Sequence, residues 1–437
     1  MVSSTNNNNE TLIHDLKLAS VGPGKVSGNN NIYEPNNIDL AMKLHYIKII
    51  YFLDNEASEE LTLKKIKEST FSWLNYYYES CGRFRRSDNG RPYIKCNDCG
   101  VRFLEAKSSK TMEEWLSIED TCVQRLLLPK YHVLGPELTF SPLVFLQVTF
   151  FKCGGISLGL SWAHVLGDPF SASNYMNTLA QFLSGNQPNH PPYLKKSPPN
   201  NFEKPIKEVI SSPLSIKNVG PIGDLWDKPT DSEIDTFSFH VAHTRLAQIQ
   251  SKLSETDLTQ TQIQPFEAVC AVIWQAIAKA KVGPRPNVIT VLRKDATGPI
   301  EDEMGLRNTQ IVSSVKADYS VEEAQLEDLA ILIRDWAQDE RAQIGEIVDR
   351  DPGGSDLIVY GSKLTFVDLQ EANFYGFEIK GMCPKFVNCF VDGIGEEGVV
   401  LVLPSPKNEG IVVTLLTPNN YMAKLKEELK NVWDLIA

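Results

Sequence analysis

The spacing of hydrophobic positions in the first half of the chain predicts strands interrupted by helices. The first forty residues show little periodicity, apart from a short extended piece around Leu12–Ala19. Apolar positions at helical spacing predict a helix over Glu60–Tyr78. Alternating runs separated by turn-rich residues then predict two hairpins. Their strands are Tyr93–Cys96 with Val101–Glu105, and Leu143–Lys152 with Gly155–Trp162.

A strand–turn–helix unit is predicted at the end of the second hairpin. The strand ends at His164, and Asp168 and Pro169 begin a helix that runs to about Leu183. Aspartate is a favoured N-cap, and proline is favoured at the first helical position. The spacing therefore places His164 in the turn between strand and helix, where side chains commonly reach solvent or substrate.

The second half of the chain follows a proline-rich stretch, Gly185–Pro229, which is typical of an inter-domain crossover. Strands and helices then alternate again. The expected strands are Asp235–His240, Val288–Leu292, Gln310–Val315 and Gly398–Leu403, and the expected helices are His243–Leu253, Gln264–Lys281 and Asn420–Leu435. Such alternation in both halves predicts an α/β fold with mixed sheets flanked by helices.

The length of 437 residues suits two domains of about 200 residues each. We expect an N-terminal domain at 1–205, a crossover linker at 206–230 and a C-terminal domain at 231–437. A strand segment near 373–395 is a candidate to cross back to the first domain.

The charge distribution excludes some partners. The net charge is −12 and no basic cluster offsets it, which argues against nucleic acid and against a purely electrostatic hold on an anionic membrane. No secretory signal and no apolar run long enough to span a bilayer is found. We expect a chain that is monomeric by itself, in the cytosol or at the cytosolic face of a membrane.

Eight cysteines are scattered along the chain, and two of them form the pair Cys96-Asn97-Asp98-Cys99. A zinc site would need a second ligand pair at comparable spacing. Cys81 and Cys122 stand alone and no histidine lies near. Reduced structural thiols are therefore favoured over a metal site.

The pair His164 and Asp168 allows two interpretations. In isolation, histidine followed four residues later by aspartate more often reflects a buried histidine and a helix cap than catalysis. The other interpretation makes His164 a general base. The residues around the pair favour the second interpretation.

The run from Phe150 to Ser171 closely resembles the signature of the plant BAHD acyltransferase family. That family shares its fold with chloramphenicol acetyltransferase and carnitine acyltransferases. Further stretches with the same resemblance are Cys81–Phe84, Gly90–Ala106, Pro142–Val144 and Phe266–Trp274. The resemblance covers nearly the whole chain. It implies a two-domain chloramphenicol-acetyltransferase-like fold with an active-site channel between the domains.

The resemblance also implies a chemistry. His164 would accept the proton of an acceptor hydroxyl or amine, which then attacks the thioester carbonyl of an acyl-CoA. The acyl-CoA is a substrate, and no cofactor is expected. Asp168 would turn away and pair with an arginine of the second domain. Arg293 stands where that arginine is expected, and its alternative is a solvated surface charge.

Two features depart from the family pattern. The second family motif, aspartate-phenylalanine-glycine-tryptophan-glycine, corresponds to Asn373-Phe374-Tyr375-Gly376-Phe377, where only Phe374 matches in place. Because that motif is structural, Asn373 and Gly376 are candidate supporting residues, together with Arg293 at its expected ion pair. Leu364 replaces a tryptophan that many members carry beside the reacting centre, and leucine offers no N–H donor. These departures put CoA-dependent turnover in question.

The departures resemble one clade, the Eceriferum/Glossy wax-biosynthesis proteins. The run from Asp39 to Leu53 and the His-Val-Leu-Gly-Asp-Pro form of the signature support this resemblance. It implies action in very-long-chain fatty-acid elongation beside a ketoacyl-CoA synthase at the endoplasmic reticulum, with His164 dispensable. The alternative is an acyl-CoA-dependent O- or N-acyltransferase, not transferring amino-acyl groups, with His164 as general base.

Overall fold

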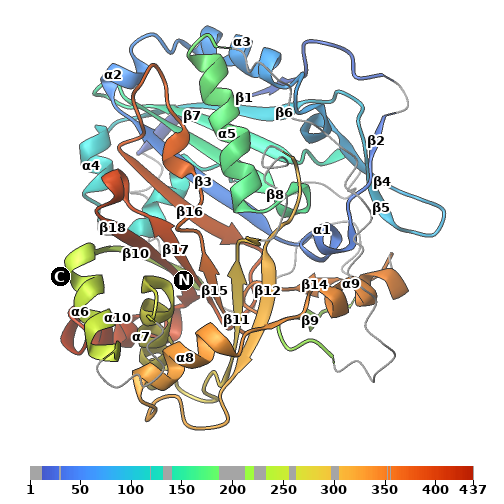
Figure 1. Ribbon diagram of the computed structural model, residues 1–437. Helices are drawn as coiled ribbons and strands as arrows, with labels where there is room; N and C mark the ends of the chain where they lie inside the picture. The colour runs from blue at the N-terminus through green and yellow to red at the C-terminus, as the bar shows by residue number, and fades with distance from the viewer. Residues whose placement is uncertain are drawn as a thin grey trace, which may run out of the picture.

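Two large mixed sheets form the framework of the protein (Figure 1). The computed structural model describes residues 12–28, 31–118, 120–130, 140–186, 212–220, 233–254, 262–296, 305–351, 353–354 and 356–436. The first sheet has the order β1 (Ile13–Val21), β6 (Val101–Ser108), β7 (Val144–Phe150), β8 (Ile156–Ala163), β3 (Tyr46–Leu53) and β16 (Phe386–Asp392). Within it only β6 and β7 run parallel.

The second sheet belongs to the C-terminal half. Its order is β10 (Ile234–Ala242), β18 (Gly410–Pro418), β17 (Val399–Pro404), β15 (Leu364–Asp368), β11 (Val288–Arg293), β12 (Ile311–Lys316) and β13 (Gln338–Asp339). Its central strands β17, β15 and β11 run parallel, and strands in such a position are buried on both faces. The expected α/β class with mixed sheets is confirmed.

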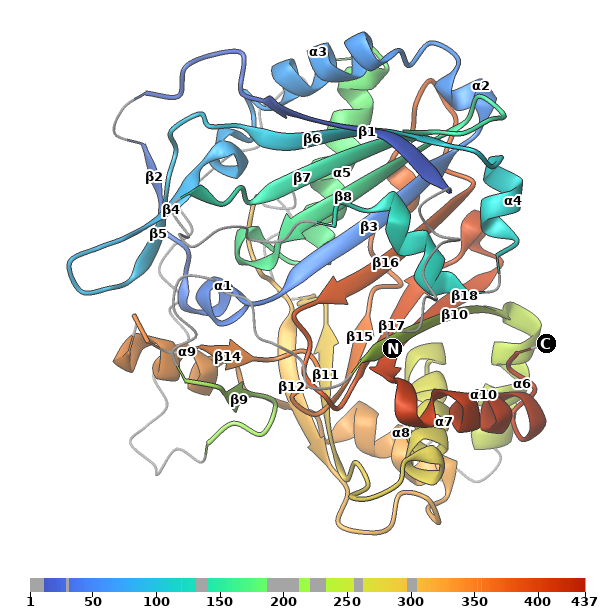
Figure 2. The ribbon, with the colours of Figure 1, turned by 180° about the vertical axis from the view of Figure 1, so that it is seen from behind.

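Helices cover the two sheets separately. In Figure 1, α5 (Pro169–Leu183) lies in front of the first sheet and α3 (Leu63–Trp73) runs above it, and in Figure 2 the strands stand in front of α5. The second sheet is covered by α6 (His243–Ser254), α7 (Pro265–Ala280), α8 (Leu326–Asp335) and α10 (Asn419–Asn431). The other described helices are α1 (Asn37–Ala41), α2 (Asn55–Ser58), α4 (Met112–Leu116) and α9 (Arg341–Arg350).

One predicted hairpin is confirmed and the other is wrong. Strands β7 and β8 pair antiparallel over their whole length. By contrast, β5 (Pro92–Lys95) pairs with β4 (Arg83–Arg86) and β2 (Ile32–Tyr33), whereas β6 joins the first sheet. Alternation identifies a strand but does not identify its partner. The predicted helix over Glu60–Tyr78 is also shorter in the structure, because Thr62 caps α3 and the helix ends at Trp73.

The two halves of the chain share the first sheet. The segment expected to return to the first domain contains β16, which pairs antiparallel with β3. Most of the predicted linker at 206–230 lies outside the described residues, which include only β9 (Lys217–Asn218) with its neighbours there; β9 pairs with β14 (Leu357–Ile358).

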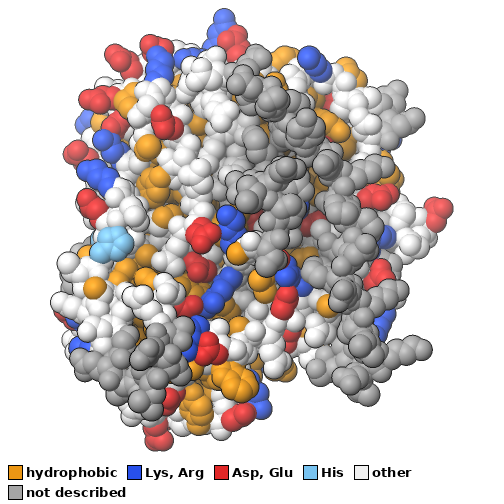
Figure 3. Space-filling view, viewed as in Figure 1, with side chains coloured by type: hydrophobic (Ala, Val, Ile, Leu, Met, Phe, Trp, Pro, Cys, Tyr) orange, Lys and Arg blue, Asp and Glu red, His pale blue; other side chains and the backbone are white. Residues whose placement is uncertain are grey.

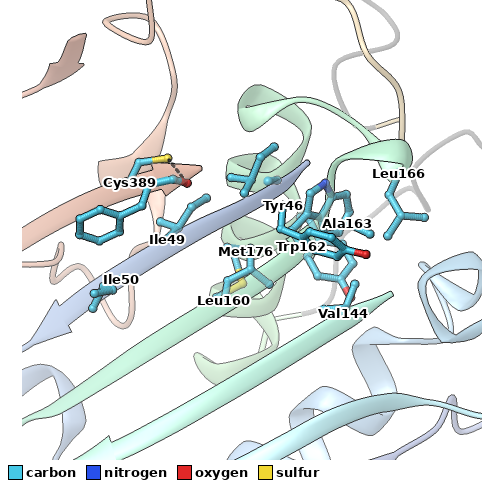
Figure 4. Packing of buried hydrophobic residues seen from close by; sticks show 14 of the residues in the cluster. Tyr46, Ile49, Ile50, Val144, Leu160, Trp162, Ala163, Leu166, Met176 and Cys389 are labelled. Atoms are coloured by element: carbon cyan, nitrogen blue, oxygen red, sulfur yellow. Dashed lines mark hydrogen bonds between the residues drawn. The ribbon is translucent and has the colours of Figure 1, made fainter. Parts of the chain in front are cut away.

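The hydrophobic core is divided into two clusters, one for each sheet. Figure 4 shows part of the first cluster, where Ile49 of β3, Leu160 and Trp162 of β8 and Met176 of α5 lie together. The side chain of Trp162 is completely buried, and its indole nitrogen donates to the carbonyl oxygen of Gly167 at 2.9 Å. The core thus fixes the end of β8, and with it the turn that carries His164.

Candidate active site

The turn after β8 is held by backbone hydrogen bonds on both sides. Residues His164–Leu166 form a single 3-10 turn, and α5 follows after Gly167 and Asp168. The amide of His164 donates to the carbonyl oxygen of His45, 3.0 Å away, just before β3. The amide of Asp168 donates to the carbonyl oxygen of Arg307 at 3.2 Å. The turn therefore links the N-terminal half to the segment that precedes β12.

Gly167 is required by this close approach. Its φ of +155° lies at the edge of the region that side chains disfavour. A Cβ at this position would stand 2.9 Å from the backbone nitrogen and oxygen of Arg307 and 2.8 Å from Cβ of Ser171. Glycine thus lets the two halves of the protein meet backbone to backbone beside His164.

Asp168 caps a helix and links the two halves of the chain through hydrogen bonds. One carboxylate oxygen accepts from the amide of Ser171 at 3.0 Å, which confirms the predicted N-cap of α5. The other oxygen accepts from the amide and the hydroxyl of Thr309, at 2.7 and 2.8 Å. The carboxylate is completely buried and fully committed to backbone and hydroxyl donors.

The predicted ion pair between Asp168 and Arg293 is wrong. Arg293 ends β11, and its guanidinium donates to the carboxylate of Glu267 in the first turn of α7 at 2.9 Å. It also lies over the ring of Phe266, 5.0 Å from the centroid. The nearer acid at the start of α7 holds this arginine, and Thr309 fills the role at Asp168 that was expected of an arginine.

The imidazole of His164 is enclosed by residues distant in sequence. It is completely buried, and its Nε2 lies 2.9 Å from the hydroxyl of Tyr360. That hydroxyl also lies 3.3 Å from the amide oxygen of Gln310, and its single proton can be donated to only one of these two neighbours. Tyr360 is itself completely buried, and burial raises the pKa of its phenol well above the usual value. The Nε2 atom of His164 is thus already hydrogen-bonded within the protein.

Electrostatics keep this histidine neutral. Burial lowers the pKa of His164 to about 4, because desolvation disfavours the charged imidazolium. A second buried histidine, His45, packs its ring edge against Tyr360 with centroids 5.0 Å apart. Its pKa falls to about 3, first through burial and then through the charge of His164. The Nε2 of His45 accepts from the amide of Val359 at 3.1 Å, which fixes the segment that carries Tyr360.

Asn308 completes the enclosure of the turn. Its side-chain amide donates to the carbonyl oxygen of His164 and to a carboxylate oxygen of Asp39, both at 2.9 Å. Asp39 lies in α1, and burial raises its pKa to about 6. Within the described part of the chain, Nδ1 of His164 and Oδ1 of Asn308 have no hydrogen-bond partner. Nε2 of Gln310 and Nδ1 of His45, beside Tyr360, also lack a partner among the described residues, so these four atoms are open to a ligand.

Leu364 was expected to replace a tryptophan beside the reacting centre, and the structure corrects this expectation. Leu364 opens β15 and is buried in the second cluster, together with Ile289 and Phe366. Because side chains alternate along a strand, Val367 packs in the first cluster instead. The aromatic residue beside His164 is Tyr360, four positions before Leu364.

The altered second motif packs against α5. Phe374–Gly376 form a 3-10 turn in which Phe374 is buried, and the carbonyl oxygen of Asn373 accepts from the side-chain amide of Asn177 at 2.8 Å. A Cβ on Gly376 would stand 2.4 Å from the Asn373 side chain. Asn373 and Gly376 thus shape a turn against the helix that follows His164. Their supporting role stays a prediction.

Several residues around His164 carried no signal in the sequence. His45 lies within a stretch that resembles the clade, but its spacing to His164 indicates nothing. Asn308, Thr309, Gln310 and Tyr360 lie more than a hundred residues downstream, and only the pairing of strands from both halves brings them to the turn.

The fold and the turn at His164 together define a two-domain protein of the chloramphenicol-acetyltransferase-like class. The sequence profile of the Transferase family matches residues 33–296, and the chain belongs to this family, the BAHD acyltransferases. Among its relatives, Protein ECERIFERUM 26 of Arabidopsis thaliana is 40% identical over 96% of this chain and 95% of the relative. Protein ECERIFERUM 2 of the same plant is 36% identical over 96% and 98%. Acyl-CoA is therefore the expected substrate class.

Solved structures confirm the fold. Vinorine synthase superposes with a TM-score of 0.73 and 15% identity, covering 97% of this chain and 98% of that one. The F. graminearum TRI101 protein in complex with coenzyme A and deoxynivalenol gives a TM-score of 0.71 and 13% identity, over 92% and 98%. At these identities the likeness extends to the fold alone.

The surface and the helices bear on membrane contact. On the face seen in Figure 3, basic and acidic side chains are interspersed among the described residues. Among the described helices, none combines the length and the apolar character needed to cross a bilayer.

Proposed function

We propose that this protein acts in very-long-chain fatty-acid elongation for cuticular wax, beside a ketoacyl-CoA synthase, without using His164 as a base. The similarity to the ECERIFERUM proteins over almost the full length supports this proposal. The proposed location is the cytosol or the cytosolic face of the endoplasmic reticulum, and the proposed ligand is an acyl-CoA with no further cofactor.

The contact between His164 and Tyr360 carries the proposal. A general base must be within hydrogen-bond reach of the proton that it abstracts, and its pKa should lie near the working pH. Here Nε2 is 2.9 Å from the Tyr360 hydroxyl, and burial lowers the imidazole pKa to about 4. A histidine in this state is a weak base, and its Nε2 is already hydrogen-bonded within the protein.

The test is co-expression with a ketoacyl-CoA synthase in yeast, followed by analysis of fatty-acyl chain lengths. We expect His164→Ala to retain chain extension, because the imidazole is not used in catalysis. Tyr360→Phe, which removes only the hydroxyl, serves as the matched variant and should also retain it. Loss of extension in His164→Ala at unchanged protein level would refute the proposal.

A second candidate function is acyl transfer to an alcohol or amine with His164 as the base. The same contact gives it some support, because the Tyr360 hydroxyl stands where an acceptor hydroxyl would donate to Nε2. Under this function, thiol release from acyl-CoA should require His164 and increase in Tyr360→Phe. Absence of turnover across acceptor panels, with folded protein, would exclude it.

A further inference from the structure

A cavity lies between the two halves of the protein, remote from His164. It has a volume of about 970 Å³ and is bounded by α4, β10, β16 and α10. We call it the α4–α10 cavity. On β16 its wall includes Phe386, which pairs with Phe52 at one end of β3, whereas Tyr46 at the other end pairs with Ala163, next to His164. Six residues of strand separate the two ends by about 20 Å.

The wall of the α4–α10 cavity has a large apolar part. Leu116 and Phe386 contribute from the first half of the framework, and Phe237, Phe239 and Leu435 from the second. The rings of Phe237 and Phe239 stack with centroids 5.6 Å apart. These side chains offer a surface on which a hydrocarbon chain can pack.

Several polar groups in the wall are already paired. The Thr121 hydroxyl donates to the carbonyl oxygen of Thr236 at 2.8 Å. The Gln124 side-chain oxygen accepts from the amide of Asn388 at 3.1 Å. The hydrocarbon part of a ligand therefore needs no hydrogen bonds here, because the protein leaves few unpaired polar groups facing it.

The charges at the cavity are mostly positive, although the whole chain carries −12. Lys426 and Lys430 lie one turn apart on α10, and the ammonium of Lys426 stands 4.2 Å from the ring centroid of Phe237. Within the described residues, Lys430 makes no ion pair. Lys385 is held by Asp54 at 2.8 Å, and Glu427 is the acid of the lining. Two lysines thus remain beside the apolar wall.

We propose that the α4–α10 cavity binds a fatty acid, with its hydrocarbon chain on the phenylalanines and its carboxylate at Lys426 and Lys430. The volume is typical of sites for small ligands, which are mostly apolar with a few polar groups that fix orientation. The half-buried Lys426 and the exposed Lys430 match an anionic head group. This inference does not depend on the proposed function, because the cavity is separate from His164.

The first experiment measures saturable binding of the fluorescent fatty acid cis-parinaric acid to the full chain. Displacement by unlabelled oleate is then compared with displacement by oleyl alcohol and by oleyl phosphate, which share the tail. We expect oleate to displace the probe about tenfold better than the alcohol. Better displacement by the phosphate would reassign the head group, and equal displacement by acid and alcohol would overturn the role of the lysines.

Substitutions test whether cis-parinaric acid binds in the α4–α10 cavity. Lys426→Glu combined with Lys430→Glu should remove the preference for acid over alcohol, whereas Lys424→Glu on the same helix, outside the cavity, should leave it unchanged. Phe237→Glu should weaken probe binding at least tenfold. Thermal unfolding checks that each variant is folded. Wild-type affinity in folded Phe237→Glu would place the fatty acid elsewhere and overturn the proposal.

Discussion

The polar side chains around His164 and those of the α4–α10 cavity are arranged in opposite ways. Around His164 the side chains of Tyr360, Asn308 and Thr309 point inward and bond to the turn or to its capping aspartate. In the cavity the polar side chains bond within the wall, and the charged groups stand at the edge. The first region is closed by its own hydrogen bonds, and the second exposes an apolar surface.

This difference shows that a sequence motif reports backbone requirements as well as chemistry. Gly167 and Asp168 are needed to bring two chain segments together and to begin a helix, whatever His164 does. The cavity has no comparable motif, because an apolar wall can be built from many residue types. We therefore expect changes at the turn to affect stability, and changes at the cavity to affect binding.

The largest effect is expected for Gly167→Ala. A Cβ there would lie 2.9 Å from backbone atoms of Arg307, so the two halves would have to separate locally. We expect a loss of about 3 kcal/mol in the free energy of unfolding, measured with urea. The matched control is Gly185→Ala, where φ is +83° but no atom lies within 4 Å. It should cost about 1 kcal/mol. Equal costs would show that the turn is not tightly closed.

A somewhat smaller effect is expected for Asp168→Ala. The change leaves the buried amides of Ser171 and Thr309 without their acceptor, which should cost about 2–3 kcal/mol. A double-mutant cycle with Arg293→Ala sharpens the test. Because Arg293 pairs with Glu267, the two costs should add to within about 0.5 kcal/mol. A coupling energy well above that would restore the predicted ion pair.

The smallest effect is a change in the pH dependence of stability. His164 has a pKa of about 4 in the folded protein and 6.5 when unperturbed. Between these values the unfolded chain binds the proton and the folded protein does not, so stability falls as the pH is lowered. His164→Gln should reduce the slope by up to about 1.4 kcal/mol per pH unit. Urea unfolding at about pH 5 and about pH 6 measures it.

The control for this slope is Asp39→Asn. The pKa of Asp39 is raised to about 6, so in the same range the folded protein binds the proton and stability increases on acidification. Removing Asp39 should therefore steepen the loss of stability at low pH, opposite to His164→Gln. An unchanged slope in His164→Gln would mean that the imidazole is exposed to solvent and not enclosed.

Local signals in the sequence predicted the elements better than their partners. The cap at Asp168 and the hairpin β7–β8 were predictable because they depend on neighbouring residues. The partner of β5 and the side of β15 that Leu364 occupies depend on tertiary pairing, and both were predicted wrongly. Arg293 was misassigned for the same reason, since Glu267 approaches it only through the packing of α7 on β11.

The site itself was half predictable. His164 and its turn followed from the motif, whereas Tyr360 and His45 did not, because nothing in the spacing of a chain shows which distant side chains fill a buried space. The channel expected between the domains stays a prediction.

The position of β16 also sets the order in which the protein can be completed during synthesis. Strand β3 is made early, but the strand that covers its second edge begins about 330 residues later. At bacterial to eukaryotic elongation rates of about 5–20 residues per second, that edge waits roughly 15–70 s on the ribosome. Its side chains are all buried in the finished protein. The nascent chain therefore carries an unpaired apolar strand edge for most of its synthesis, which is where a chaperone would have to act.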